Sequence, residues 1–138
     1  MASAQLLDSL VASEFEIEIN GSKLTGIFRI SNLVSLKFDE TGKRHTPPFE
    51  IAKMVQRDVS SAFNIWLIES TNARSGSTRP TRDIVIKAVD DGLVTRTWTI
   101  KNAFLMEVRY SDFNVASFEM VEEVYTLGYE DIVEAFTA

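Results

Sequence analysis

The chain has 138 residues, of which 45% are hydrophobic and 25% charged, a balance typical of one globular domain. Its formal net charge of −6 argues against a protein that wraps nucleic acid, because phosphate binding relies on clustered lysine and arginine. The chain contains no cysteine, which excludes disulfides and thiolate metal sites.

The N-terminal residues 1–14 carry a short apolar pattern and predict an arm or a brief helix at the start of a single domain of residues 1–138. This segment has neither a basic start nor a long apolar centre, so we expect no export signal. Because no apolar run approaches the roughly 20 residues that a membrane-spanning helix needs, we also expect no membrane anchoring.

Two β-hairpins are predicted from turn sequences that lie between alternating apolar and polar residues. Asn20-Gly21 separates a strand beginning at Phe15 from a strand that continues to Ile30, and Asn-Gly is typical of a type I′ turn, in which both central residues have positive φ. Asp90-Asp91-Gly92 plays the same part between two later strands. A further strand is expected over residues 33–39.

Residues 40–52 predict a protruding loop, because they contain Gly42 and the pair Pro47-Pro48, which a central strand does not accommodate. Ser60 or Ser61 is a suitable N-cap for a following helix. That helix is apolar on most of its circumference, so we expect it to pack against the domain or a neighbour.

The run "FNVASFEMVEEVYTLGYEDI", residues 113–132, alternates apolar and acidic side chains and predicts one long strand. Phe118, Met120 and Val124 are expected to fill the core, with Val121 on the opposite face. The whole chain therefore predicts a mainly β fold: an antiparallel β-sandwich or barrel of about seven strands with one flanking α-helix.

Catalytic and metal-binding motifs are weak in this sequence. His45, the one histidine, lies in a proline-rich loop without a nucleophile pattern around it. Adjacent Glu122 and Glu123 point to opposite faces of a strand, so they do not form one acid–base pair or one ligand set. No glycine-rich phosphate-binding motif is present. We expect neither an enzyme nor a bound cofactor or metal.

Three stretches in the same order suggest a family: "MVQRDVSSAFNIWLIES", the basic loop "ARSGSTRPTRDIVIKAVDD", and "TWTIKNAFLMEVRYSDFNVASFEMVEEVYTLGYEDI". Together they resemble the tail tube proteins of contractile-tailed bacteriophages, a family that includes inner tube proteins of phage-like injection systems. Its fold is similar to that of the type VI secretion tube. The resemblance runs from about residue 52 to residue 132. Arg57 is followed by Asp58, where the family often has a basic residue and then glycine.

The resemblance implies a structural subunit that forms hexameric rings, stacked into a hollow tube that conducts DNA or protein cargo. The implied partners are further copies of the chain, a contractile sheath protein, and baseplate and tail-terminator proteins. The implied location is a virion tail or an injection particle. A tube-initiator or adaptor ring is the first alternative, and a β-sandwich ligand-binding module is the second. An enzyme that uses carboxylates is ranked last.

Three groups of residues receive roles under this resemblance. The inter-ring contact is assigned to the predicted loop, with an apolar anchor and a charged rim: Phe49, Lys43 and Arg44. The subunit interface is assigned to one face of the last strand: Val121, Tyr125 and Leu127. The lumen is assigned to acidic side chains that would repel a translocating polyanion: Glu107, Glu119 and Glu123.

Overall fold

The computed structural model describes residues 10–73 and 79–136. Most of the predicted arm or helix of residues 1–14 lies outside this range, and its described part, residues 10–14, contains no helix. In chain order the elements are β1 (Phe15–Ile19), β2 (Ser22–Lys23), β3 (Ile27–Ser31), β4 (Phe49–Met54), α2 (Ala62–Asn72), β5 (Arg82–Asp90), β6 (Leu93–Tyr110), β7 (Glu122–Gly128) and β8 (Asp131–Phe136). The predicted mainly β fold with a flanking helix is confirmed for the described residues.

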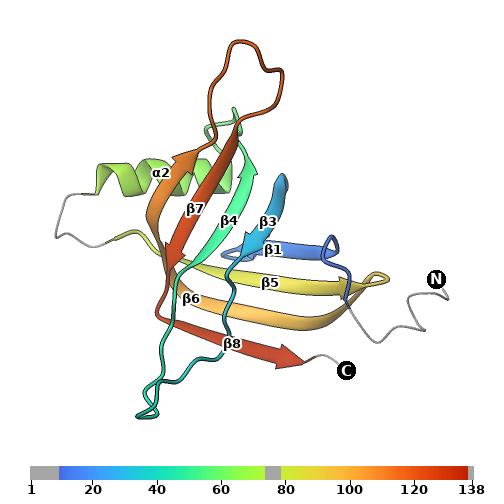
Figure 1. Cartoon of the computed structure of the whole chain (residues 1–138), viewed down its shortest axis with the longest axis vertical. Helices are drawn as coiled ribbons and strands as arrows, with labels where there is room; N and C mark the ends of the chain where they lie inside the picture. The colour runs from blue at the N-terminus through green and yellow to red at the C-terminus, as the bar shows by residue number, and fades with distance from the viewer. Residues whose placement is uncertain (1–9, 74–78, 137–138) are drawn as a thin grey trace.

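All the strands pair antiparallel along one open path, β2-β1-β5-β6-β7-β4-β3, and β8 pairs with β6. The ends of this path do not pair with each other, so the sheet does not close into a barrel. The path divides at β6 into two parts that cross in space (Figure 1). We call β1, β2, β5, β8 and the first part of β6 the first sheet, and β3, β4, β7 and the last part of β6 the second sheet.

The long strand β6 belongs to both sheets, because it has 18 residues and each sheet pairs with only part of it. Its first part pairs with β5 and β8, and its last part pairs with β7. Asn102 interrupts it with a φ of 53°. The Asn102 amide donates to Asp83 at 3.0 Å and its side chain donates to Glu130 at 3.0 Å, which holds this conformation in place. The two sheets therefore share one bent strand.

The core lies between the two sheets. The first sheet contributes mainly isoleucines, and the second sheet contributes larger and more aromatic side chains, among them Phe49, Tyr125 and Leu127. Helix α2 covers one end of the core with Phe63 and Trp66. The ring centroids of Phe63 and Tyr125 are 4.6 Å apart. Burying each of these large side chains stabilises the fold by about 1.5–3 kcal/mol.

Both predicted hairpin turns and the predicted helix cap are confirmed. Asn20 and Gly21 have φ values of 48° and 86°, and Asp91 and Gly92 have values of 51° and 81°, as type I′ turns require. Ser61 is the N-cap, and its side chain accepts a hydrogen bond from the Asn64 amide. The turns and the helix cap can be predicted from the sequence because they depend on only a few neighbouring residues.

The strand after the first hairpin differs from the prediction. It ends after Lys23, and the chain passes Gly26, at a φ of 82°, before β3 begins. Whereas β2 pairs with β1 in the first sheet, β3 pairs with β4 in the second. The positive φ at Gly26 allows this change of direction, since a residue without Cβ adopts that conformation at low cost.

Two other predicted segments are wrong. Residues 33–39 form no strand and belong to a loop over residues 32–48, while β4 already begins inside the predicted loop of residues 40–52. The predicted strand of residues 113–132 is a loop over residues 111–121, followed by β7 and the start of β8. Phe118 and Met120, expected in the core, are therefore exposed, at 103% and 72%.

Candidate assembly surfaces

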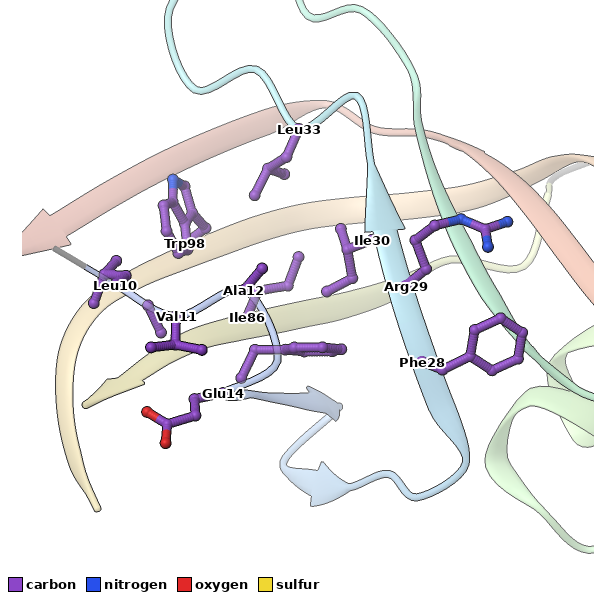
Figure 2. Close-up of a pocket in the computed structure, with 12 residues that line it drawn as sticks. Leu10, Val11, Ala12, Glu14, Phe28, Arg29, Ile30, Leu33, Ile86 and Trp98 are labelled. Atoms are coloured by element: carbon purple, nitrogen blue, oxygen red, sulfur yellow. The ribbon is translucent and has the colours of Figure 1, made fainter. Parts of the chain in front are cut away.

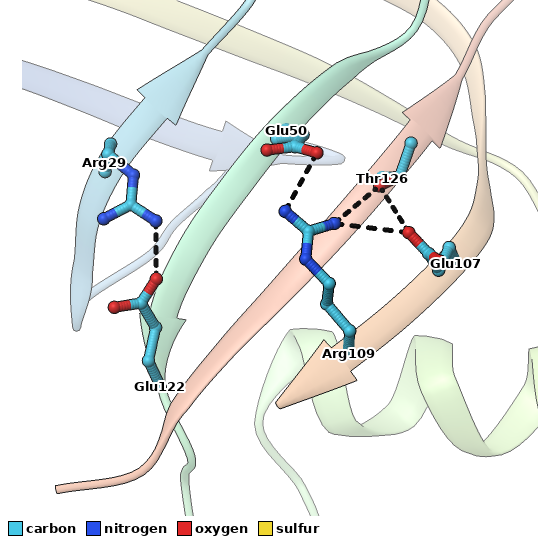
Figure 3. Close-up of polar contacts among 6 residues, drawn as sticks. All are labelled: Arg29, Glu50, Glu107, Arg109, Glu122 and Thr126. Carbon is cyan, nitrogen blue, oxygen red and sulfur yellow. Dashed lines mark hydrogen bonds and ion pairs between the residues drawn. The ribbon is translucent and has the colours of Figure 1, made fainter. Parts of the chain in front are cut away.

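The alternation of side chains along β7 places Glu122 and Glu123 on opposite faces of the second sheet. Glu123 is 2% exposed and points into the molecule, beside the buried aromatic residues. Glu122 pairs with Arg29 of β3 on the other side (Figure 3). We call these the core face and the outer face of the second sheet.

The core face carries a buried ion pair. Lys53 and Glu123 are directly opposed in the register of β4 and β7, and the Lys53 Nζ lies 2.6 Å from a Glu123 carboxylate oxygen. The Tyr125 hydroxyl donates to that carboxylate at 2.9 Å. Burial, together with the nearby Glu123 charge, raises the pKa of Tyr125. Lys53 also donates to the Met54 carbonyl at 3.3 Å.

This arrangement is structural. Lys53 is 0% exposed, and its Nζ lies 5.7 Å from the centroid of the Phe63 ring, which helix α2 provides. A pair of charges removed from water in this way persists only when both are present and further hydrogen bonds satisfy them. The prediction that Glu123 faces a lumen is wrong, because the side chain is enclosed by the subunit's own core.

The outer face carries an exposed network of ion pairs (Figure 3). One guanidinium nitrogen of Arg109 lies 3.1 Å from Glu50, and another lies 3.2 Å from Glu107. The hydrogen bond that Arg109 donates to Glu50 raises the pKa of Arg109. Thr126 lies between them and its hydroxyl donates to Glu107 at 3.4 Å. With Arg29 and Glu122, the network joins two arginines to three carboxylates, so its charge is nearly balanced.

The loop of residues 32–48 is fastened to the subunit. Arg44 pairs with Asp131 at 2.8 Å and donates to the Ile132 carbonyl at 2.7 Å. The Ser35 hydroxyl donates to Glu134 at 2.5 Å. These contacts attach the loop to β8, so Arg44 already has a partner within its own chain. Neighbouring Lys43 is exposed.

A small network around Asp39 shapes the tip of the same loop. Its carboxylate accepts hydrogen bonds from the Thr41 hydroxyl at 2.6 Å and the Lys43 amide at 3.0 Å. His45 lies 2.9 Å from the other carboxylate oxygen. The bonds from Thr41 and His45, followed by that from Lys43, lower the pKa of Asp39 to about 2. The one histidine thus has a place in loop structure.

Phe49, the predicted apolar anchor on a neighbouring ring, has the opposite placement. It is the first residue of β4 and is 0% exposed. Its ring contacts Tyr129, with centroids 5.8 Å apart. The prediction is wrong because the strand begins earlier than the proline-rich sequence suggests, which turns Phe49 into the core and leaves it no surface to offer another ring.

The loop of residues 111–121, unlike the buried Phe49, exposes large apolar side chains. It projects beyond the ends of β6 and β7 at one extreme of the molecule (Figure 1). Its exposed apolar residues are Phe113 at 80%, Val115 at 107%, Phe118 at 103% and Met120 at 72%. Concentrated apolar exposure of this kind marks an interaction site more often than a solvated loop.

The hydrogen bonds found for this loop are mostly local, apart from the one that the Val55 amide donates to the Val121 carbonyl at 3.3 Å where the loop ends. The Ser111 amide donates to the Glu122 carbonyl at 2.9 Å, and the Glu122 amide donates to the Ser111 hydroxyl at 2.8 Å, which closes its base. The Ala116 amide donates to the Asn114 side chain at 2.9 Å. The sequence analysis missed this loop because its apolar spacing imitates a strand. Asn114, whose side chain competes for backbone amides, is the signal that indicates a turn.

The remaining predicted site residues do not gather on one surface. Tyr125 and Leu127 are 0% exposed, so their assignment to a subunit interface is wrong. Val121 is half-buried at the end of the loop of residues 111–121. Glu119 lies in that loop, whereas Glu107 lies on the outer face of the second sheet.

Within the described part of the chain, no group of three or more histidine, cysteine, aspartate or glutamate residues could hold a metal ion. Helix α2 is also too short to cross a membrane, and no described helix is long and apolar enough to do so. The geometry is that of exposed surfaces around a packed core, which can bind other macromolecules through loops and sheet faces.

No family model matches the chain, and no curated protein matches it in sequence. Solved structures do match its fold. A chain in the tube-terminating cap of the anti-feeding prophage superposes with a TM-score of 0.76 at 17% identity, covering 95% of this chain and 93% of that chain. A chain in the sheath-tube complex of the PVC extracellular contractile injection system gives a TM-score of 0.74 at 14% identity, covering 99% and 98%.

Hcp1 from Flavobacterium johnsoniae is similar as well, with a TM-score of 0.59 at 12% identity, covering 90% of this chain and 96% of that chain. The chain therefore has the fold that these tube, cap and Hcp proteins share. The predicted likeness to tube proteins is confirmed at the level of fold.

Proposed function

We propose that the protein is a structural subunit of the inner tube of a contractile phage tail or a phage-like injection system. It forms hexameric rings that stack around a lumen conducting DNA or protein cargo. One observation carries this proposal: the fold of a chain from a sheath-tube complex is matched over 99% of this chain and 98% of that chain. Both chains are covered almost completely, so the shared fold accounts for nearly all of each chain.

The outer face of the second sheet is the surface that we assign to the lumen. Its arginines are already paired with carboxylates, so they do not offer free positive charge to a passing phosphate backbone. The small excess of carboxylates makes the wall weakly repulsive toward a polyanion. Glu107 belongs to this face, which retains one of the three predicted lumen residues.

An end ring is the second candidate. It is favoured by the match to a chain in a tube-terminating cap, whose TM-score of 0.76 is close to the value of 0.74 for a chain in a sheath-tube complex. An end ring would bind a baseplate or terminator partner on one side. It would form single rings, whereas a main tube subunit would also stack.

Electron microscopy of the purified protein at rising concentration tests the proposal. Rings with six-fold symmetry, or tubes built from them, are the expected result. Co-expression with a contractile sheath protein should yield particles that contain the chain in many copies for a main tube and in few copies for an end ring. A monomer at every concentration, absent from any particle, would overturn both candidates.

Thiol labelling tests the lumen assignment, since the chain has no cysteine of its own and therefore no background. We expect Glu107→Cys to react with small and polymer-linked maleimides in the free subunit. In assembled tubes it should still react with the small reagent but not with the large one, which cannot enter the lumen. Equal reaction with the large reagent before and after assembly would place the outer face elsewhere.

A further inference from the structure

An apolar groove opens beside β3, where the two sheets separate. Because the chain leaves the first sheet after β2 and passes Gly26 to join the second sheet as β3, it does not fully cover the end of the first sheet. The groove has a volume of about 350 Å³. Segment 10–14, β3, β5 and the first part of β6 surround it, with Val11, Ile30 and Trp98 among its walls (Figure 2).

The groove and the loop of residues 111–121 have matching chemistry. The loop offers phenylalanines that are 80% and 103% exposed, and the groove offers an opening lined mostly by aliphatic and aromatic side chains, with Glu14 and Arg29 as its charged members. The loop lies at one extreme of the molecule, away from segment 10–14 and β5 (Figure 1), and both of these line the groove. The loop therefore cannot fill the groove of its own chain.

We propose that the loop of residues 111–121 inserts into this groove on a second copy of the chain. Each phenylalanine buries about 150–250 Å² when enclosed, so Phe113 and Phe118 alone supply about 300–500 Å². A standard interface buries about 800 Å² per partner, of which these two side chains are a large share. The contact is heterologous, because the two surfaces differ, and it generates a ring or a stack according to the rotation it imposes.

The charge of the chain sharpens this proposal. Each copy carries a formal charge of −6, and the loop itself contributes Asp112 and Glu119. Two copies repel each other at long range, so the contact depends on apolar burial at short range. Screening by salt weakens the repulsion but not the burial, so self-association should strengthen as salt is raised. A contact made by ion pairs would respond in the opposite direction.

This inference rests on the proposed function only in that both require the chain to assemble with itself. It names the surfaces involved, and it places Glu119 at the contact between copies rather than at the lumen. Ala12, a small exposed residue in the wall of the groove, provides a site at which the groove can be probed without removing a core side chain.

Cysteine pairing maps the contact directly. Glu119→Cys keeps all the apolar side chains of the loop, and it is mixed with Ala12→Cys and a short thiol cross-linker. We expect the mixed dimer to form on the order of tenfold faster than with Ala135→Cys, a matched exposed alanine on β8, because docked thiols have a high effective concentration. Equal rates for the two pairs, or products dominated by Glu119→Cys dimers, would overturn the proposal.

Complementary mutants give a second test. A loop variant, Phe113→Ser with Phe118→Ser, keeps an intact groove, and a groove variant, Ala12→Glu, keeps an intact loop. Sedimentation should show each alone as a monomer and their mixture as a dimer that does not grow, because one intact contact remains. Leu36→Ser, which removes a side chain that is 68% exposed in the other long loop, should associate like the unchanged protein.

The outcomes separate this inference from the proposed function. If both variants form rings and tubes as efficiently as the unchanged protein, the loop and groove contact is refuted while the tube function stands. If the loop cross-links to the groove but the unchanged protein yields only open, irregular chains, the contact stands and the tube function is refuted. Unchanged melting temperatures in the variants would show that neither result comes from misfolding.

Discussion

The two faces of the second sheet hold charge in different ways, and the neighbouring residues Glu122 and Glu123 illustrate the difference. Glu123 is enclosed with Lys53 at 2.6 Å; its carboxylate also accepts from the Tyr125 hydroxyl, and the Lys53 ammonium also donates to a backbone carbonyl. Glu122 pairs with Arg29 in water, beside a network centred on Arg109. Identical side chains one position apart thus have separate tasks, one in the stability of the subunit and one in the charge of its surface.

Glu122 and Glu123 are expected to contribute differently to the stability of the fold. A buried charge that loses its partner keeps the full cost of desolvation, whereas an exposed charge that loses its partner is solvated by water. The outer face can therefore change with little effect on the fold, as the proposed lumen assignment requires. On the core face, replacing only one member of the ion pair destabilises the fold.

The largest expected effect is from breaking the buried pair. Glu123→Ala should lower the free energy of unfolding by about 3–5 kcal/mol, because it leaves the Lys53 ammonium buried and unpaired. Urea denaturation followed by tryptophan fluorescence measures this. Glu122→Ala is the matched control and should lower it by about 1 kcal/mol or less. Equal losses for the two variants would remove the distinction between the faces.

Replacing both members of the buried pair should restore the free energy of unfolding that Glu123→Ala lowers. Lys53→Met with Glu123→Leu fills a similar volume with apolar groups, and such replacements are neutral or stabilising by about 1–4 kcal/mol. The same denaturation measurement checks it. A double variant as unstable as Glu123→Ala would show that the Tyr125 hydroxyl, left without its acceptor, matters more than the ion pair.

On the outer face, Arg109→Ala should lower the free energy of unfolding by about 1 kcal/mol or less, because its ion pairs are exposed. Its effect should be on assembled particles. Without Arg109, Glu50 and Glu107 lose their counter-charge. Under the proposed lumen assignment, their equivalents in neighbouring subunits would then repel one another, so particles should melt at lower temperature in low salt and recover in high salt. Arg57→Ala, which removes an equal charge from another exposed site, is the control.

The smallest effect concerns pH at the loop of residues 32–48. The pKa of Asp39 is lowered from 3.8 to about 2 by its hydrogen bonds to the loop. A lowered folded-state pKa means that its stabilisation is present above pH 3.8 and is lost as pH falls through about 2. Carboxyl chemical shifts in NMR should give a midpoint near 2, and a midpoint near 3.8 would show that the network does not form in solution.

Several parts of the fold were predictable because they depend on neighbouring residues. Asn20-Gly21 and Asp91-Gly92 adopt the positive φ values of type I′ turns, and Ser61 caps its helix, as local chemistry requires. The mainly β class follows from alternation repeated along the chain. The strand expected at residues 33–39 is wrong because alternation alone does not require a buried face: Leu36 and Phe38 are 68% and 55% exposed in the loop.

The candidate site was harder to predict. Alternation correctly separates Glu122 from Glu123, but it does not say which face is buried, so Glu123 was assigned to a lumen and Tyr125 to an interface. The decisive residue is Lys53, whose burial depends on a partner seventy positions away in sequence, as the register Lys53↔Glu123 shows. A lysine in a strand ordinarily indicates solvent.

The sequence by itself therefore determined the local conformations: the tight turns, the helix cap, and which residues share a side of each strand. Only the tertiary structure decided which side is inside, because that depends on how β6 bends at Asn102 and divides its pairing between two sheets. It also decided that residues 111–121 leave the sheet and expose their apolar side chains. Both features depend on long-range packing, in which segments distant in sequence compete for places in the same core.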